Sequence, residues 1–145
     1  MPLRKRQKPM PARQLTNISL FARCTDEELA KVDSLLTEVK TDAGEVLCRE
    51  GAEGAECFIV VEGDAKVTLR GKQIATFGPG SVFGEMSLLD GGPRSATVTA
   101  TSPMRVYVLD RGSFFALLRE APSVTEKVLE ALAARLRAAE KAPGR

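Results

Sequence analysis

The sequence predicts a mainly β fold with helices at both ends, and three observations lead to that prediction. Between residues 38 and 110, short runs rich in Val, Ile, Thr and Phe are interrupted by turn residues roughly every ten positions, as in a β sandwich or barrel. Before and after this region the apolar residues recur at three- and four-residue steps, which is helical spacing. The chain of 145 residues is long enough for one hydrophobic core, so we expect one domain with tails.

A helix is predicted before the β region. Thr25 is followed three residues later by Glu28, which is the pattern of a capping box at a helix start. Because apolar side chains then recur at helical spacing, the helix is expected to begin near Asp26 and to run toward Leu36.

Seven strands are recognisable in the β region. Glycines such as Gly54, Gly63 and Gly71 stand between the runs and fit turns. Seven or eight strands suit a jelly roll, and we expect an eight-stranded antiparallel one, flanked by the N-terminal helix and two C-terminal helices. The strands expected are 37–41, 45–49, 57–62, 65–70, 73–77, 96–101 and 104–109.

Two helices are predicted after Asp110. The first ends at the break formed by Ala121 and Pro122. Ser123, with Glu126 three positions on, is expected to cap the second helix, which is amphipathic and ends before Pro143.

The net charge of +2 hides an asymmetry along the chain. Residues 1–13 contain five basic and no acidic side chains, which leaves the rest of the chain at −3. A basic arm could touch phosphate or an acidic membrane surface, but three prolines and few apolar residues fit a disordered tail equally well. We expect a disordered basic tail over 1–13, a folded domain over 14–141 and a short tail over 142–145.

Several function classes are disfavoured by composition. The sequence contains no histidine, the commonest general base and metal ligand, so neither a catalytic nor a metal site is expected and the chain is not predicted to be an enzyme. Cys24, Cys48 and Cys57 are widely spaced without a CxxC pair, which favours buried free thiols. No stretch approaches the roughly 20 apolar residues of a membrane span, and no signal peptide is visible, so a cytoplasmic location is expected.

Residues 83–100, FGEMSLLDGGPRSATVTA, break the strand pattern. The part from Gly84 to Leu89 can make one helical turn, and the glycines around it let the backbone approach a ligand closely. The unpaired amides of such a turn favour an anion, and Arg94 adds a planar cation suited to phosphate oxygens. The segment therefore predicts a pocket for a monoanion.

Glu85 is the informative residue of this segment. A phosphate repels a neighbouring carboxylate unless that carboxylate accepts hydrogen bonds from another group, and ribose hydroxyls are good donors. Glu85 holding a sugar while Arg94 holds the attached phosphate explains both charges. From the spacing alone, the alternative that Glu85 and Arg94 pair with each other is equally open.

The segment resembles the phosphate-binding cassette of the cyclic-nucleotide-binding domain family, which includes regulatory subunits of cAMP-dependent protein kinase and the bacterial catabolite activator protein. The family pattern is FGE, a small residue, Leu, a short Gly-containing loop, then Pro-Arg-(Ser/Thr/Ala)-Ala-Thr-Val, and it is present without a gap over 18 residues. The resemblance extends over roughly residues 20–137. It departs from the family at Ala55, where the family often has Asp in a turn.

This resemblance implies roles for individual residues. Glu85 would hold the ribose 2′-hydroxyl and Arg94 the cyclic phosphate, while Ser95 and backbone amides would complete the phosphate shell. The ligand-binding residues expected on this basis are Gly84, Glu85, Met86, Arg94, Ser95 and Ala96.

The resemblance also bears on the base. In the family a Thr after the Arg often accompanies cGMP preference, and here the position is Ser95, so cAMP is the expected ligand and cGMP the alternative. The base usually needs a lid from the last helix, and this chain has no Trp. Leu132, Arg135 and Leu136 are the lid candidates, unless they simply pack on the barrel or face water.

The predicted function is a cyclic nucleotide-binding regulatory module that signals by repositioning its C-terminal helices. Three alternatives stay open: a degenerate jelly-roll module acting as a protein-interaction domain without nucleotide, a cGMP-preferring receptor, and nucleic-acid binding through the basic tail. No intrinsic DNA-binding domain or other output segment is recognisable, so the partner would be an unknown effector protein. The chain is either a free-standing receptor or a piece of a larger protein.

Overall fold

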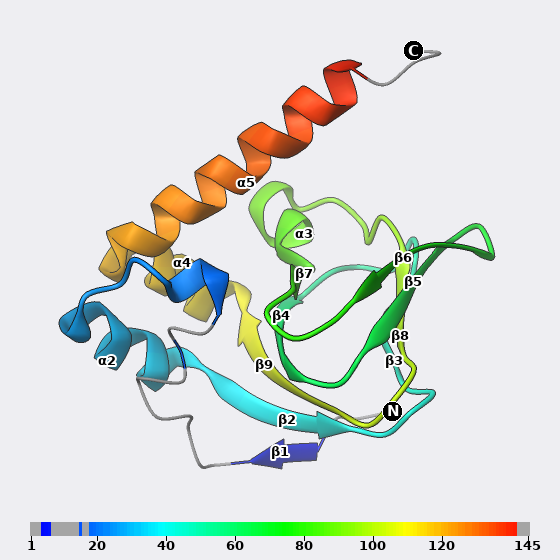
Figure 1. Ribbon diagram of the computed structural model, residues 1–145, viewed down its shortest axis with the longest axis horizontal. Helices are drawn as coiled ribbons and strands as arrows, with labels where there is room; N and C mark the ends of the chain where they lie inside the picture. Colours follow the sequence, from blue (N-terminus) through cyan, green and yellow to red (C-terminus); the bar gives the residue numbers. More distant parts are fainter. Residues whose placement is uncertain (1–3, 7–14, 16–17, 142–145) are drawn as a thin grey trace.

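Turn residues between the apolar runs reverse the chain repeatedly, and in the computed structural model these reversals build two antiparallel sheets (Figure 1). The structure describes residues 4–6, 15 and 18–141. Strands β2 to β9 form the predicted eight-stranded jelly roll, and β1 adds to one edge. The sheet orders are β1-β2-β9-β4-β7 and β3-β8-β5-β6. The strands are β1 (Arg4–Arg6), β2 (Thr37–Thr41), β3 (Val46–Cys48), β4 (Glu56–Glu62), β5 (Ala65–Leu69), β6 (Lys72–Phe77), β7 (Val82–Phe83), β8 (Thr97–Ala100) and β9 (Met104–Asp110).

Of the eight strands of the jelly roll, β7 is the one that was not among the seven expected. It has two residues, Val82 and Phe83, which pair with Ile59 and Phe58 of β4. Two residues are too few to show an alternating pattern, so nothing in the sequence distinguishes this strand from a loop.

Residues 4–6 lie within the segment predicted as a disordered tail, residues 1–13. They form β1, which pairs antiparallel with β2. Without β1, β2 would be the edge of its sheet with unpaired backbone groups, and β1 supplies partners for them. The other residues of the predicted tail, and the short tail predicted at 142–145, lie outside the described residues.

Strand β4 is buried on both faces and separates two hydrophobic clusters. Because side chains alternate along a strand, Phe58 and Val60 point into the barrel, whereas Cys57 and Ile59 pack against the helices. All four are at most 1% exposed. Burying an apolar side chain of this size contributes about 1.5–3 kcal/mol to the stability of the fold. Strand β4, paired with β9, therefore anchors both clusters.

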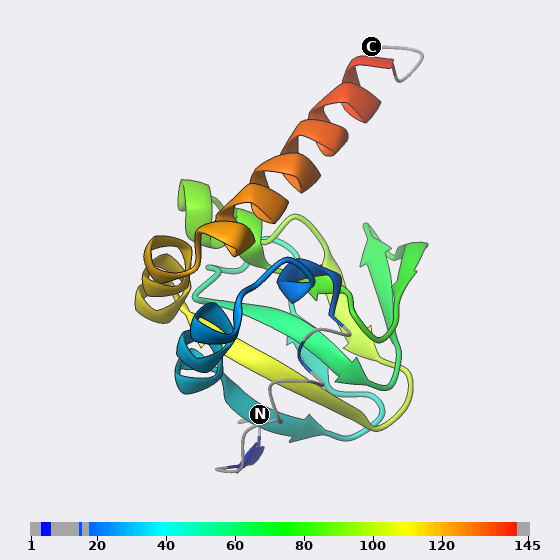
Figure 2. The ribbon, with the colours of Figure 1, turned by 60° about the vertical axis from the view of Figure 1, so that its left-hand side comes forward.

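The helices gather on one side of the barrel (Figure 1). In both views α5 passes beside α3, and its carboxyl end extends away from the strands (Figure 1, Figure 2). The short 3₁₀ helix η1 contacts α5, and α2 contacts α4. The helices are η1 (Ser19–Phe21), α2 (Asp26–Leu35), α3 (Glu85–Asp90), α4 (Arg111–Glu120) and α5 (Pro122–Lys141).

Glu28 connects two of these helices. The predicted capping box is confirmed, since Thr25 and Glu28 exchange hydrogen bonds of 2.9 and 3.1 Å at the start of α2. The Glu28 carboxylate also accepts bonds from the backbone N–H and the hydroxyl of Ser123 at 3.0 and 2.8 Å. The start of α5 is therefore fixed to α2 through one buried acid.

Ser123 does not cap α5, contrary to the prediction. The helix begins one residue earlier, at Pro122, whose fixed φ suits the first helical position. Ser123 consequently lies inside the first turn, where its side chain is free to bind Glu28 rather than its own helix.

Replacing Glu28 with Gln is expected to lower the free energy of unfolding at neutral pH by about 1–3 kcal/mol, because three hydrogen bonds to a buried carboxylate lose their charged acceptor. Urea denaturation measures the change. Glu27→Gln, in the same turn of α2 but exposed, is the control and should change stability by less than about 0.5 kcal/mol. Equal effects of the two substitutions would contradict the role given to Glu28.

The stabilities of wild type and Glu28→Gln should also respond differently to acid. Hydrogen bonds, first from the Ser123 backbone and then from Thr25, hold the pKa of Glu28 below its ordinary value of 4.5. Since the folded pKa is the lower one, this stabilisation is complete above pH 4.5 and is lost as the pH falls toward the folded pKa. The stability difference between wild type and Glu28→Gln should therefore shrink on acidification.

Candidate functional site

The turn between β7 and α3 requires a glycine for two reasons. Gly84 has φ +88°, a left-handed conformation that strains other residues. A Cβ at this position would also lie 2.7 Å from Nη1 of Arg94 and 2.9 Å from the carbonyl oxygen of Glu56. The backbone therefore approaches the Arg94 side chain more closely than any residue with a Cβ would allow.

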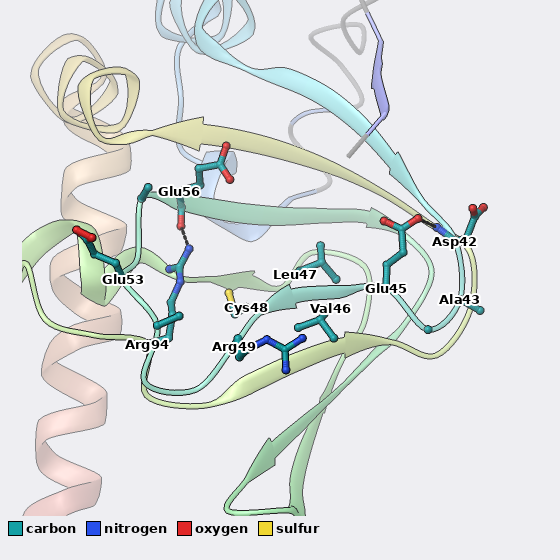
Figure 3. Close-up of a pocket in the computed structure, with 13 residues that line it drawn as sticks. Asp42, Ala43, Glu45, Val46, Leu47, Cys48, Arg49, Glu53, Glu56 and Arg94 are labelled. Carbon is teal, nitrogen blue, oxygen red and sulfur yellow. Dashed lines mark hydrogen bonds between the residues drawn. The ribbon is translucent and has the colours of Figure 1, made fainter. Parts of the chain in front are cut away.

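Arg94 is a buried cation held by main-chain oxygens. It is 8% exposed, and its Nη1 and Nη2 donate to the carbonyls of Gly84 at 3.0 Å and Glu56 at 2.6 Å. Figure 3 shows the second bond, with the Glu56 carboxylate turned away from Arg94. Among the described residues no carboxylate forms a salt bridge with Arg94. The guanidinium is thus oriented without being neutralised, and its other N–H groups are suited to an anion.

Glu85, the first residue of α3, is paired with α5. It is 8% exposed, and its two carboxylate oxygens each lie 3.5 Å from a terminal nitrogen of Arg135. Arg135 is half-exposed, and both contacts are at the long limit of a hydrogen bond. Glu85 does not pair with Arg94, so the two charges of this segment have separate partners.

One cavity of about 210 Å³ brings the predicted site residues together. It is lined by all six residues predicted to bind the ligand and also by Arg135. An acid and a base therefore share one cavity whose other walls are largely apolar. Those walls are formed by Cys48, Val67, Phe77, Phe83 and Val98, with Ser87.

The three lid candidates are placed differently. Arg135 lines the 210 Å³ cavity and also a second cavity of about 410 Å³ beneath α5, and Glu85 lines both as well. Leu132 lines only the second cavity. Leu136 lines neither and is 62% exposed. The Glu85–Arg135 pair consequently stands at the boundary between the two cavities.

A larger hollow of about 720 Å³ lies on the other side of Arg94, along β3 and the loop before β4 (Figure 3). Arg94 and Cys48 line both this hollow and the 210 Å³ cavity. Glu85 does not reach it, so the pairing of acid and base belongs to the smaller cavity alone.

The predicted free cysteines are confirmed, and two of them lie close to the site. Burial raises the pKa of the Cys48 thiol to about 11 and that of Cys57 to about 12. Both are therefore protonated at neutral pH and are not nucleophiles: Cys48 is an inert wall of the cavity, and Cys57 belongs to the hydrophobic core behind it.

Two contacts in the site were not predicted, that of the Glu56 carbonyl with Arg94 and that of Arg135 with Glu85. The Glu56 carbonyl holds Arg94, but every residue carries a carbonyl, so no sequence pattern marks this one. Arg135 was predicted to cover the base, whereas its contact with Glu85 depends on the crossing of α3 and α5 (Figure 2). In the part of the chain that the structure describes, no metal-binding cluster of acidic or cysteine side chains occurs, and no helix has the length and apolar character to cross a bilayer.

Known proteins share both the sequence and the fold. Residues 38–121 match the family described as "Cyclic nucleotide-binding domain". A cAMP-dependent protein kinase regulatory subunit of Yarrowia lipolytica is 38% identical over 99 residues, 68% of this chain and 26% of that subunit. The structure of Thermus thermophilus catabolite activator protein matches with a TM-score of 0.76 and 33% identity, over 83% of this chain and 59% of that one.

A further solved structure, cAMP-bound PfPKA-R, matches with a TM-score of 0.74 and 30% identity, over 91% of this chain and 47% of that one. The chain spans less than two thirds of the length of each of these relatives. The family match includes all of the segment from Gly84 to Ala96 that lines the cavity. The chain belongs to the cyclic nucleotide-binding domain family.

Proposed function

We propose that the chain is a cyclic nucleotide receptor that prefers cAMP and binds it in the cavity between α3, Arg94 and α5. One observation carries the proposal: a buried carboxylate and a buried guanidinium face one cavity, and neither neutralises the other. A cyclic nucleotide offers the matching pair of groups, a sugar hydroxyl that donates and a phosphate that accepts.

Each group of the site has a role in this proposal. Arg94 binds the cyclic phosphate with the N–H groups that its two carbonyl partners leave available. The amides of Gly84, Met86 and Ala96 and the exposed Ser95 hydroxyl complete the phosphate shell. Glu85 accepts the ribose 2′-hydroxyl.

The size of the cavity supports a lid that closes over the base. Ligand pockets commonly measure roughly 300–1,000 Å³, and the 210 Å³ cavity is smaller, so it suits the ribose, the phosphate and only one edge of the base. The base then needs cover from outside, where Arg135 already borders the cavity. A carboxylate has about four lone-pair sites, so Glu85 can accept the ribose hydroxyl and Arg135 together. Bound nucleotide thereby favours one position of α5, which is the requirement for a ligand-driven switch.

The apolar walls favour adenine over guanine. Guanine carries an amino group and a ring N–H that both need acceptors, and an unsatisfied buried donor costs about 1–3 kcal/mol. Val67, Phe77 and Val98 offer side chains without acceptors. The Ser95 hydroxyl is a single acceptor atom, whereas guanine has two donor groups. The Yarrowia lipolytica relative is a regulatory subunit of a cAMP-dependent protein kinase and PfPKA-R was solved with cAMP bound, which is consistent with this preference.

The output passes through α5 to an effector protein that we do not identify. Val124 and Val128 are buried and anchor the first half of α5, whereas Leu136 in the second half is 62% exposed. Movement of the second half therefore changes a surface that another protein contacts.

Calorimetric titration should show binding of cAMP, with weaker binding of cGMP. Arg94→Ala should weaken cAMP binding by about 100-fold or more, because it removes a desolvated charged partner. Glu85→Gln should weaken it about tenfold through the loss of a charged acceptor. Arg119→Ala, on the exposed face of α4, is the matched control and should leave affinity unchanged. Wild-type protein that binds neither nucleotide would leave the degenerate-module alternative standing.

Hydrogen exchange tests the switch. cAMP should slow amide exchange over residues 83–96, where it binds, and also over 123–140, because closure orders α5. Exchange measured by mass spectrometry with and without ligand gives both regions in one experiment. Protection confined to 83–96 would rule out the lid.

Arg135 should couple the two regions. In Arg135→Ala, cAMP is still expected to slow amide exchange over residues 83–96. The slowing over residues 123–140 should disappear, because the link from α5 to Glu85 is removed. Affinity should fall about threefold to tenfold, the equivalent of one net hydrogen bond. Arg137→Ala is the control, an exposed arginine of the same helix that lines neither cavity. Coupling that survives Arg135→Ala would assign the lid to other residues.

A further inference from the structure

The loop between β3 and β4 forms the back of the Arg94 site. The N–H of Gly51 donates to the Arg94 carbonyl at 2.9 Å, and the Arg94 N–H donates to the Ala52 carbonyl at 2.8 Å. Glu53 and Pro93 add a β bridge. The backbone of Arg94 is therefore bound to residues 51–53, far from it in sequence.

Glu56, the first residue of β4 and directly after this loop, holds the side chain of Arg94. The Glu56 carbonyl accepts from Nη2 at 2.6 Å (Figure 3). Ala55, the residue before Glu56, has no carboxylate that could form an ion pair with Arg94. Because no ion pair fixes the guanidinium among the described residues, its direction depends on how closely this loop packs around it.

Gly54 makes that close packing possible. It was predicted as a turn glycine, but its φ is not positive, so the backbone conformation alone would accept another residue. A Cβ at Gly54 would instead lie 2.4 Å from Cβ and 2.7 Å from Oγ of Ser87, and 3.1 Å from Cζ of Arg94. The glycine is required by contact with α3 and with the guanidinium, not by the turn.

We infer that Gly54 is a positioning residue for anion binding: by lacking a Cβ, it lets the 51–56 loop hold Arg94 and Ser87 in place from behind the cavity. This inference rests on the proposed function. Gly54 does not line the 210 Å³ cavity, so it acts on a ligand only through Arg94 and α3.

The test is Gly54→Ala, with Gly112→Ala as the matched control. Gly112 also lacks a positive φ, and a Cβ there would lie 3.7 Å from the nearest atom, Oδ1 of Asp110, which is an ordinary contact. In calorimetry, Gly54→Ala should weaken cAMP binding at least about tenfold, because small displacements of positioned groups are costly, whereas Gly112→Ala should bind as wild type does.

Two further measurements distinguish a positioning role of Gly54 from a merely structural one. In the ligand-free protein, the Arg94 guanidinium signals in ¹⁵N NMR should shift in Gly54→Ala and not in Gly112→Ala. Adding Ser87→Gly removes both serine atoms that collide, so Gly54→Ala/Ser87→Gly should bind cAMP within about threefold of Ser87→Gly alone, a non-additive effect.

The outcomes are distinguishable. Wild-type affinity in Gly54→Ala overturns the positioning role while leaving the proposed function intact. An equal loss with and without Ser87→Gly does so when the Arg94 signals are also unshifted, because the contact of the new Cβ with Arg94 then has no effect either. If wild type binds no cyclic nucleotide, the proposed function fails, and the NMR signals of Arg94 still decide the role of Gly54. Unshifted signals would then overturn it.

Discussion

The site depends on a buried guanidinium whose direction is fixed by neutral partners. Two carbonyls orient Arg94, and neither cancels its charge. A buried cation without a counter-ion is costly unless it is well hydrogen-bonded, and a bound anion offsets that cost further. Gly84 and Gly54 follow from the same constraint, because main chain must approach the guanidinium where side chains would collide.

Two acidic side chains, in addition to the apolar clusters, connect the helices to one another and to this site. Glu28 joins α2 to the start of α5, and Glu85 joins α3 to the fourth turn of α5 through Arg135. The first contact is short and buried, whereas the second is long and half-exposed on the arginine side. In the proposed function, this difference keeps the start of α5 fixed while its later turns respond to what occupies the cavity.

Local chemistry explains what was predictable. The capping box at Thr25, the strands and the cassette are each specified by contiguous residues, and all but β7 of the jelly-roll strands fold close to where predicted. Contacts between distant segments were not predictable: Ser123 binds Glu28 instead of capping α5, and β1 pairs with β2 where a disordered tail was expected. Gly54 is the clearest case, since the same residue type serves a turn or a close contact, and only the fold distinguishes them.

The most direct test of the central claim is a crystal structure of the chain with cAMP. The cyclic phosphate is expected at about 2.7–2.9 Å from Arg94 nitrogens, with both carbonyl bonds to Arg94 kept and the ribose hydroxyl on Glu85. A nucleotide whose phosphate binds away from Arg94, or an Arg94 side chain that has left the Gly84 and Glu56 carbonyls, would contradict it.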